Sequence, residues 1–380
     1  MKLFILAFIL IYASMHLYAL RAASAAIAIA PGVKAAIALV MLILIFTPFN
    51  IRYAESTGHE FVAIVAAYIG YYWMALLLYL VLSLFTFDIY RLVVFLAAYV
   101  SRSDVERMGP LKVSSAASFY ISIIFSVCVC VYGYFEARAI RVEKVAIRTN
   151  KVSVPVKIAQ ISDVHIGTII RDKRLKDIAA AIARENPDLL FVTGDLVDGQ
   201  PDNINNLARY LDAVKAPSGK YAVTGNHEFY AGLNKSLEFI RQCGFRILRN
   251  EAADIGNSVV IAGVDDPEVS RNSRPHNKSE KELLMGIPQD KYTILLKHRP
   301  DVGEEGLFDL QLSGHTHKGQ FFPFNIITWM YHSKHSGLVK LNERGFLYVN
   351  RGVGTWGPPI RVLSPPEITI IELIPENMGK

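Results

Sequence analysis

Cysteine is scarce in this chain of 380 residues, which contains only three. Cys128 and Cys130 lie inside an apolar stretch, and Cys243 stands alone. This spacing implies no disulfide framework and no cysteine-based zinc site. The chain also lacks a basic block interleaved with aromatic residues, although its formal net charge is +6. The charge pattern therefore indicates no nucleic-acid partner.

Charge is scarce in the N-terminal third. Residues 1–136 carry 14 charged side chains, whereas the remaining 244 residues carry 60. Four apolar stretches of 17 residues or more lie here, each long enough to cross a bilayer as a helix that rises about 1.5 Å per residue. They are Leu3–Leu20, Ala35–Ile51, Phe61–Phe87 and Val113–Phe135. We therefore predict an integral, multi-pass cell-membrane protein with about four transmembrane helices in residues 1–137, and the lipid bilayer as a partner.

Two apolar stretches leave alternatives open. Leu3–Leu20 follows Met1 and Lys2 and fits a signal peptide, but the three further spans favour an uncleaved anchor. Leu92–Val100 is too short to span and has a basic residue near each end. This pattern favours an interfacial or packed helix.

The loop charges bear on which side of the membrane holds the rest of the chain. Six basic residues lie in the loops after the first and third apolar stretches, two lie on the other side, and five more follow the last stretch. Basic loops favour the cytoplasm, but long domains cross largely regardless of charge. If the last five are discounted, the C-terminal domain lies outside the cytoplasm, which we favour. If they are counted, the two sides are nearly even.

From residue 156 onward, predicted strands and helices alternate. A short basic segment, residues 138–155, precedes them as a linker or first strand, with a candidate strand at Val142–Ile147. This order predicts two stacked sheets with helices outside in residues 156–380. The predicted strands are Val156–Ile161, Asp188–Thr193, Tyr221–Thr224, Ser258–Ala262, Tyr292–Leu296, Asp309–Leu312, Phe346–Val349 and Ile368–Leu373, and the predicted helices are Arg174–Arg184, Ile204–Ala213 and Asn234–Cys243.

Polar residues follow several of these strands. Asp163 and His165 stand just past the first strand, and a carboxylate with an imidazole suits a divalent metal. Further groups follow in order, namely Gly194-Asp195, Gly225-Asn226-His227-Glu228, His298 and Gly314-His315-Thr316-His317. Open α/β sheets bind ligands beyond the carboxyl ends of their strands, so these residues are expected to meet. Asp, Asn and His without Cys favour a pair of ions such as Mn, Fe, Zn or Co over a structural zinc.

The ordered blocks resemble the signature of the calcineurin-like metallophosphoesterases. That signature is Asp-x-His, Gly-Asp, Gly-Asn-His-Glu/Asp, a lone His and Gly-His-x-His, and all five blocks stand in order between Asp163 and His317. The resemblance covers about residues 150–375. It is strongest to the bacterial membrane-anchored branch, because the tail Asn350–Arg361 also resembles that branch. Lys318 departs from it, since the branch usually has Gly after the second His. The resemblance implies a four-layer α/β domain, a two-sheet β-sandwich flanked by helices, beside an α-helical transmembrane bundle.

The same resemblance implies roles for the site residues. Two divalent ions would have three ligands each and share a seventh: Asp163, His165 and His317 for one, Asn226, His298 and His315 for the other, and Asp195 as the bridge. Two ions roughly 3.5–4 Å apart clamp a phosphoryl group, and a hydroxide held between them attacks it. His227, beside the ligand Asn226, would act as a catalytic residue that protonates the leaving oxygen or stabilises its charge. Asp198 or Glu228 would orient His227.

The residues after the last block allow two interpretations. Phe321–Tyr331 is rich in aromatic residues. It is either a core strand and turn, which we favour, or an apolar lip that dips toward lipid or grips an acyl chain. His276, His332 and His335 match no block and are expected at the surface or at the rim of the site.

The predicted function is that of a membrane-bound, metal-dependent phosphoesterase. It would hydrolyse phosphodiester, pyrophosphate or phosphomonoester bonds, with lipid-linked phosphate esters as one substrate class. The alternatives are an anchored phosphodiesterase for soluble nucleotides or cell-wall polymers, and a membrane sensor that has lost catalysis. The intact ligand set argues against the sensor, because a degenerate domain would be expected to lose a ligand.

Overall fold

The structure is a computed structural model that describes residues 2–101, 111, 113–198, 204–256, 258–268 and 278–376. The chain divides into two compact units, Met1–Tyr134 and Phe135–Lys380.

The N-terminal unit is helical throughout most of its described residues. Its helices are α1 (Lys2–Ala26), α2 (Pro31–Ile45), α3 (Thr47–Ser56), α4 (Glu60–Val100) and α5 (Ser115–Glu136), the last of which ends just inside the second unit. Three of them, α1, α4 and α5, are long and apolar enough to cross a membrane, and α2 with α3 makes a fourth if the bent pair counts as one span. Large apolar side chains such as Leu17 and Ile124 are exposed along these helices, which is typical of surfaces that face lipid.

The predicted single helix over Ala35–Ile51 was wrong. Helix α2 ends at Ile45, and α3 begins at Thr47 after a bend of 52°. Pro48 lies in the first turn of α3. Proline has no N–H to continue the hydrogen bonding of the preceding helix, so the chain bends before it.

The predicted separate helix over Leu92–Val100 was also wrong, because these residues form the end of α4. Helix α4 continues through two charged residues, Asp88 and Arg91, that form an ion pair with each other. Arg91 Nη1 lies 2.8 Å from Asp88 Oδ1, one turn away. The hydroxyl of Tyr18 on α1 donates to the other oxygen of Asp88 at 2.6 Å, so the charge does not interrupt the apolar helix.

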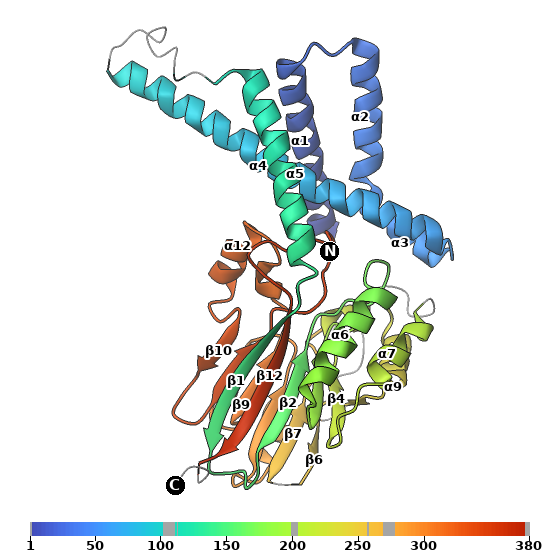
Figure 1. Ribbon diagram of the computed structural model, residues 1–380, viewed down its shortest axis with the longest axis vertical. Coiled ribbons are helices and arrows are strands. Elements are labelled where there is room, and N and C mark those ends of the chain that lie inside the picture. The colour runs from blue at the N-terminus through green and yellow to red at the C-terminus, as the bar shows by residue number, and fades with distance from the viewer. Residues whose placement is uncertain are drawn as a thin grey trace. The chain divides into compact units, whose positions relative to one another are not determined.

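Two six-stranded mixed sheets form the framework of the unit Phe135–Lys380 (Figure 1). The strand order is β1-β12-β2-β3-β4-β5 in the first sheet and β10-β11-β9-β8-β7-β6 in the second. The strands are β1 (Arg141–Thr149), β2 (Val156–Ile161), β3 (Leu189–Thr193), β4 (Gly219–Val223), β5 (Arg246–Ile247), β6 (Glu251–Asp254), β7 (Val259–Gly263), β8 (Tyr292–Leu296), β9 (Leu310–Ser313), β10 (Gly337–Lys340), β11 (Phe346–Val349) and β12 (Glu367–Pro375). The segment 138–155 thus contains β1, which pairs in parallel with β12.

Helices cover the outer faces of both sheets. Helices α6 (Asp172–Glu185), α7 (Ala208–Asp212) and α9 (Leu233–Gln242) pack on the first sheet (Figure 1), and α11 (Glu280–Met285) packs on the second. Shorter elements are η3 (Asn205–Leu207), α8 (Asn226–Tyr230), η4 (His317–Gly319) and α12 (Phe324–Tyr331). The order helix, sheet, sheet, helix confirms the predicted four-layer α/β fold.

Alternation along the strands divides their apolar side chains between two cores. Ile158 of β2 packs with Leu296 of β8 between the sheets, whereas Ile161 packs with Ile178 of α6 under the helices. All four side chains are fully buried, and each such burial contributes about 1.5–3 kcal/mol. Because both faces of the inner strands are covered, these strands read as continuous apolar runs in the sequence.

The carboxyl ends of the inner strands of both sheets meet at one edge. Strands β2, β3 and β4 run parallel in the first sheet, as do β8 and β9 in the second. Gln160 near the end of β2 donates to the carbonyl of Ser313 at the end of β9, at 3.0 Å. This contact joins the two sheets where the polar loops begin.

The favoured interpretation of Phe321–Tyr331 as a core strand was wrong. Phe324–Tyr331 forms the helix α12, in which no residue is buried. An aromatic-rich run of this length fits either a short strand or a short helix, and only packing decides between them.

Candidate metal centre

The ligand candidates lie in loops that leave the strands abruptly. Five of the seven have a positive φ: Asp163 (51°), His165 (54°), Asp195 (51°), His315 (70°) and His317 (48°). This left-handed conformation costs a non-glycine residue about 1–3 kcal/mol and is concentrated at functional sites. The surrounding fold therefore holds these side chains in place at the expense of local backbone strain.

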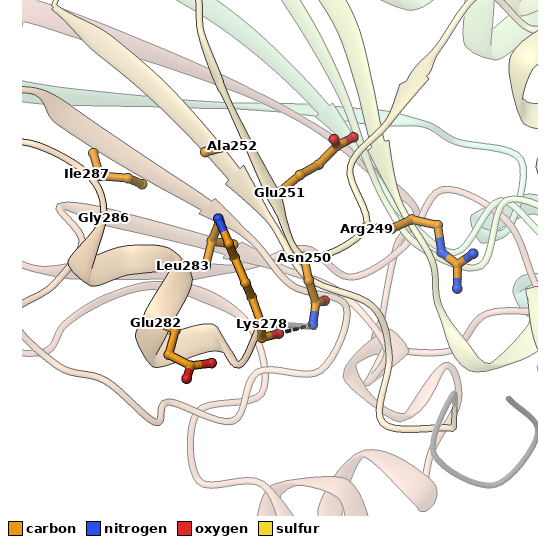
Figure 2. Close-up of a pocket in the computed structure, with 9 residues that line it drawn as sticks. All are labelled: Arg249, Asn250, Glu251, Ala252, Lys278, Glu282, Leu283, Gly286 and Ile287. Carbon is orange, nitrogen blue, oxygen red and sulfur yellow. Dashed lines mark hydrogen bonds between the residues drawn. The ribbon is translucent and has the colours of Figure 1, made fainter. Parts of the chain in front are cut away.

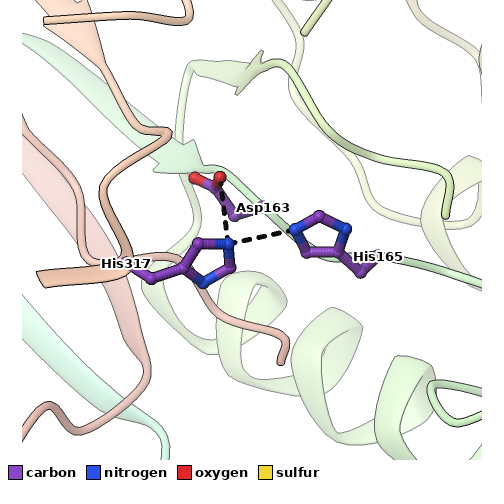
Figure 3. Close-up of side chains that lie close together, drawn as sticks. All are labelled: Asp163, His165 and His317. Atoms are coloured by element: carbon purple, nitrogen blue, oxygen red, sulfur yellow. Dashed lines mark hydrogen bonds and ion pairs between the residues drawn. The ribbon is translucent and has the colours of Figure 1, made fainter. Parts of the chain in front are cut away.

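Three of the predicted ligands converge in a first cluster. Asp163, His165 and His317 point their ligand atoms toward one another (Figure 3), and all these atoms lie within 4.8 Å of each other. The two Nε2 atoms of the histidines are 3.0 Å apart, and Nε2 of His317 is 3.4 Å from Oδ1 of Asp163. Facing nitrogen lone pairs at this distance need a proton or a cation between them.

A second cluster forms beside the first. Oδ2 of Asp195 lies 3.2 Å from Nε2 of His298, which in turn lies 3.1 Å from Nδ1 of His315. The carbonyl of Thr193 lies 2.8 Å from Nδ1 of His298. A hydrogen bond there fixes the ring and directs Nε2 into the cluster, as is common for metal-binding histidines.

Asp195 faces both clusters, and Asn226 follows the neighbouring strand β4. The same Oδ2 of Asp195 that faces His298 lies 3.9 Å from Nε2 of His165 in the first cluster. Oδ1 of Asn226 is buried and has no hydrogen-bond partner among the described residues. A buried carbonyl oxygen without a donor is costly, and a cation would satisfy it. The donor set of carboxylate, amide and imidazole groups thus fits divalent metal ions.

The comparisons with known proteins agree with this geometry. The family model described as calcineurin-like phosphoesterase matches residues 156–319. A metallophosphoesterase of Aquifex aeolicus is 42% identical over 248 residues, which cover 64% of this chain and 95% of that relative. The chain belongs to the calcineurin-like metallophosphoesterase family. This confirms the predicted family, and members of this family hydrolyse phosphoester bonds, which confirms the predicted class of enzyme.

Two further proteins resemble this metallophosphoesterase. The transmembrane protein with metallophosphoesterase domain of Danio rerio is 29% identical over 326 residues, which cover 80% of this chain and 74% of that protein. Among solved structures, the calcineurin-like phosphoesterase YfkN from Bacillus subtilis is 17% identical, with a TM-score of 0.33 over 57% of this chain and 81% of that chain.

Burial and neighbouring charges shift the pKa values of two histidines in the second cluster in opposite directions. Burial alone would lower the pKa of His298, but the carboxylates of Asp195 and Asp163 raise it to about 10. Burial and the neighbouring His298 lower the pKa of His315 to about 3. Protons and metal ions compete for the same nitrogens, so metal affinity is expected to fall as the pH falls.

Of the two carboxylates expected to orient His227, Asp198 contacts its ring, whereas the carboxylate of Glu228 binds backbone amides instead. Oδ1 of Asp198 lies 2.8 Å from Nδ1 of His227 and 3.7 Å from Nδ1 of His165. Burial would raise the pKa of Asp198, but the two neighbouring imidazoles of His165 and His227 hold it well below its usual range. A charged carboxylate on Nδ1 leaves Nε2 of His227 free to face a substrate.

Glu228 ties two of the loops together. Its fully buried carboxylate accepts hydrogen bonds from the amides of Asp195 (3.0 Å), Val197 (3.1 Å) and Gly225 (2.7 Å). Asp195 and Gly225 follow the neighbouring strands β3 and β4, so one side chain sets the position of Asp195 relative to the loop that contains Asn226. The sequence had suggested a different role for this residue, because local spacing places it next to His227.

Replacing Glu228 with glutamine is expected to lower the midpoint of thermal unfolding by several degrees. The amide of glutamine keeps one acceptor oxygen but turns an NH2 group toward backbone donors. Leaving a buried amide without an acceptor lowers the free energy of unfolding by about 1–3 kcal/mol. In a domain of this size, each kcal/mol lowers the thermal midpoint by about 2–4 °C. The measurement is differential scanning fluorimetry of the full-length protein. Glu251→Gln on the exposed part of β6 is the control, and equal midpoints for the two variants would contradict this role.

The tail segment Asn350–Arg361 supports the first cluster. The amide of Gly354 donates to the carbonyl of Asp163 at 3.0 Å. Arg361 is fully buried, donates to the carbonyl of Gly354 at 2.7 Å, and places Nη2 3.3 Å from Nδ1 of His317. Sequence reasoning assigned no role to Arg361. The only signal for it was the resemblance of this tail to one branch of the family.

Of the three histidines that match no block, two lie at the rim of the site and one lies outside the described part of the chain. The ring of His332 lies 6.2 Å from that of His315, and the carbonyl of His335 accepts from the hydroxyl of Thr316 at 2.7 Å. Both belong to the segment that follows α12, at the rim as expected. His276 lies outside the described residues.

A separate cavity of about 510 Å³ contains none of the predicted ligands. Figure 2 shows its lining around Asn250, whose amide donates to the carbonyl of Lys278 at 2.8 Å. Arg249 is paired with Asp265 at 2.7 Å, and the carboxylate of Glu282 accepts from the amide of Ser279. Several of its polar groups already have partners, so this cavity offers no catalytic set.

Proposed function

We propose that this metallophosphoesterase is a membrane-bound enzyme with a dinuclear centre that hydrolyses phosphodiester, pyrophosphate or phosphomonoester bonds. The observation that supports it best is the position of Asp195, whose Oδ2 faces both clusters, 3.9 Å from Nε2 of His165 and 3.2 Å from Nε2 of His298. One oxygen in this position fits a ligand shared by two ions. The other six ligands would divide into Asp163, His165 and His317 for one ion and Asn226, His298 and His315 for the other.

The residues around the centre provide the rest of the chemistry. Two divalent ions would neutralise the phosphoryl charge and make water nucleophilic at neutral pH. His227 supplies the proton for the leaving oxygen, with Asp198 holding its Nδ1 at 2.8 Å. The backbone N–H of His227 donates to Oδ1 of Asp195 at 2.9 Å, so the proton donor is fixed relative to the shared ligand. Asn226 precedes His227 at the start of α8 and would position it by holding a metal.

Lipid-linked phosphate esters are the substrate class that we favour. Helix α5 ends at Glu136 and β1 begins at Arg141. The four residues between them reach at most about 14 Å when extended. If α5 spans a membrane, the catalytic unit lies close to the lipid headgroups. The loop charges support a catalytic unit outside the cytoplasm.

Soluble nucleotides remain the alternative substrate class because of two aromatic residues. The rings of Tyr230 and Trp356 lie 5.5 Å and 5.8 Å from the ring of His227, and both side chains are about half exposed. Exposed aromatic rings beside the leaving-group acid would stack on a base. A catalytically silent sensor has no such support, since every predicted ligand is present.

Metal removal tests the proposal directly. Detergent-purified full-length protein with added Mn²⁺ is expected to hydrolyse a chromogenic phosphodiester or monoester and to bind about two metals per chain. Treatment with a chelator is expected to abolish turnover, and Mn²⁺ is expected to restore it. Protein that binds no metal and turns over neither substrate would exclude the proposed enzyme. Soluble phosphodiesters cleaved as well as any lipid phosphate ester would exclude the lipid-linked class alone.

A further inference from the structure

Helix α12 has its polarity reversed relative to an ordinary surface helix. Its two polar residues, Asn325 and Thr328, are half-buried, and the backbone of Asn325 packs directly against Gly319. Six apolar side chains are exposed instead: Phe324, Ile326, Ile327, Trp329, Met330 and Tyr331. Met330 and Tyr331 are 75% and 84% exposed. A contiguous apolar surface of this kind marks an interaction site.

The stretch of sequence that contains α12 carries charge of one sign. Residues 318–340 contain Lys318, Lys334 and Lys340 and no aspartate or glutamate. In space Lys334 lies 4.0 Å from Glu305, so the positive charge that this stretch adds comes mainly from Lys318 and Lys340. Aromatic residues flanked by lysine favour the headgroup region of an anionic bilayer. A second copy of the chain fits this surface less well, because self-pairing would bring the lysines of both copies together.

Two adjacent residues of the catalytic unit, Val362 and Leu363, hold the chain just before α12 and the last residue of α5. The amide of Phe322 donates to the carbonyl of Val362 at 3.3 Å, and the amide of Leu363 donates to the carboxylate of Glu136 at 3.1 Å. Glu136 is the last residue of α5. Figure 1 shows α12 at the end of the catalytic unit where β1 begins. The exposed apolar helix thus lies beside the point where the chain enters this unit from its last apolar helix.

The helix also follows the metal centre directly. His317 is the first residue of η4, and α12 begins seven residues later. After α12 the chain returns to the site, where the ring of His332 contacts that of His315 and the carbonyl of His335 is bound to Thr316. A surface that binds α12 would therefore also fix the position of the residues at the rim of the metal centre.

We propose that α12 is a membrane-docking helix that inserts its apolar side chains among the headgroups of an anionic bilayer. The proposal rests on the proposed membrane anchoring and adds a second, independent contact of the catalytic unit with lipid. Docking by α12 holds the rim of the metal centre at the lipid surface. It would favour substrates presented by the membrane.

A fluorescent label on α12 tests this docking. The full-length protein with Cys128, Cys130 and Cys243 replaced by serine or alanine would carry one new cysteine, in Met330→Cys on α12, Met285→Cys on α11 or Ile124→Cys on α5. Met285 and Ile124 are the matched controls, because they are 65% and 63% exposed against 75% for Met330. Each variant is labelled with an environment-sensitive fluorophore and placed in nanodiscs of anionic lipid with and without a lipid-borne quencher.

The lipid-borne quencher is expected to lower the fluorescence of the labels at positions 330 and 124 about twofold or more. The fluorescence of the label at position 285 is expected to change little. Quenching at Ile124 without quenching at Met330 would overturn the docking and leave the anchoring intact. No quenching at either position would overturn both. A label at Met330 that is shielded but not quenched would indicate a protein partner and overturn the lipid as occupant. If the cysteine replacements prevent folding, a photo-crosslinking residue at position 330 of the otherwise natural chain provides the alternative test. Cross-links to lipid would support the docking, and cross-links to protein alone would overturn it.

Discussion

Asp195→Asn is expected to lower kcat/KM for a chromogenic phosphodiester on the order of 10³-fold. The two oxygens of Asp195 have different tasks. Oδ1 accepts the backbone N–H of His227 at 2.9 Å, and Oδ2 faces His165 and His298 in the two clusters. Asparagine that keeps the first contact must turn its NH2 group toward His165 and His298, where the metals are proposed to bind. The substitution therefore replaces a shared anionic ligand with a donor while the size of the side chain stays the same.

The measurement combines kinetics with metal content on the same sample. We expect the variant to bind fewer metals per chain than the natural protein, and its thermal midpoint to show that it is folded. Asp254→Asn is the control, because this aspartate is half exposed on β6 and lies 3.3 Å from Lys291 away from the ligand set. Turnover within about tenfold of the natural protein, with two metals still bound, would exclude the shared-ligand role.

The elements that carry the site were predictable because their signals are local. Strands β2, β8 and β11 were predicted with their observed bounds. Each is a short apolar run that is bounded by polar or turn residues. The polar residues that follow such runs emerge at the carboxyl ends of strands, where α/β folds bind ligands. This is why Asp163 and Asp195 could be placed together before any contact was known.

Other elements depend on packing that the local sequence does not encode. Helix α12 was expected as a core strand because its apolar residues have no clear period, yet none of its side chains is buried. The edge strands β5 and β6 have two and four residues, too few for any periodicity. The long helix α4 passes through Asp88 and Arg91, whose charges pair within the helix, while Asp88 also accepts a hydrogen bond from Tyr18 of another helix.

The supporting residues of the site were the least predictable part. Glu228 contacts amides that lie 3, 31 and 33 residues away, and the guanidinium of Arg361 lies next to His317 from 44 residues away. Such contacts follow from the order in which strands pair and not from spacing along the chain. A motif therefore identifies the ligands, whereas the fold decides which neighbours hold them.

The second large effect is expected from His227→Asn, and it depends on the leaving group. With an unactivated alkyl phosphodiester, kcat is expected to fall about 10²–10⁴-fold, because the leaving alkoxide must be protonated. With a p-nitrophenyl ester the loss is expected to stay below about tenfold, since that leaving group needs no proton. The two substrates are compared on the same metal-loaded preparation. Asp198→Asn is expected to show the same preference in weaker form, because it removes the charge that orients Nδ1 of His227.

The pH dependence separates a proton donor from a residue that only packs. Burial lowers the pKa of His227, but the carboxylates of Asp195 and Asp198 raise it to about 9. Bound cations would lower that value again by repelling the imidazolium. The donor is the protonated form, so turnover of the alkyl substrate is retained below the pKa and lost as the pH rises through it. His227→Asn should lack this falling limb. If the variant loses turnover of both substrates equally and its rate still falls at high pH, His227 maintains the structure of the site without donating the proton.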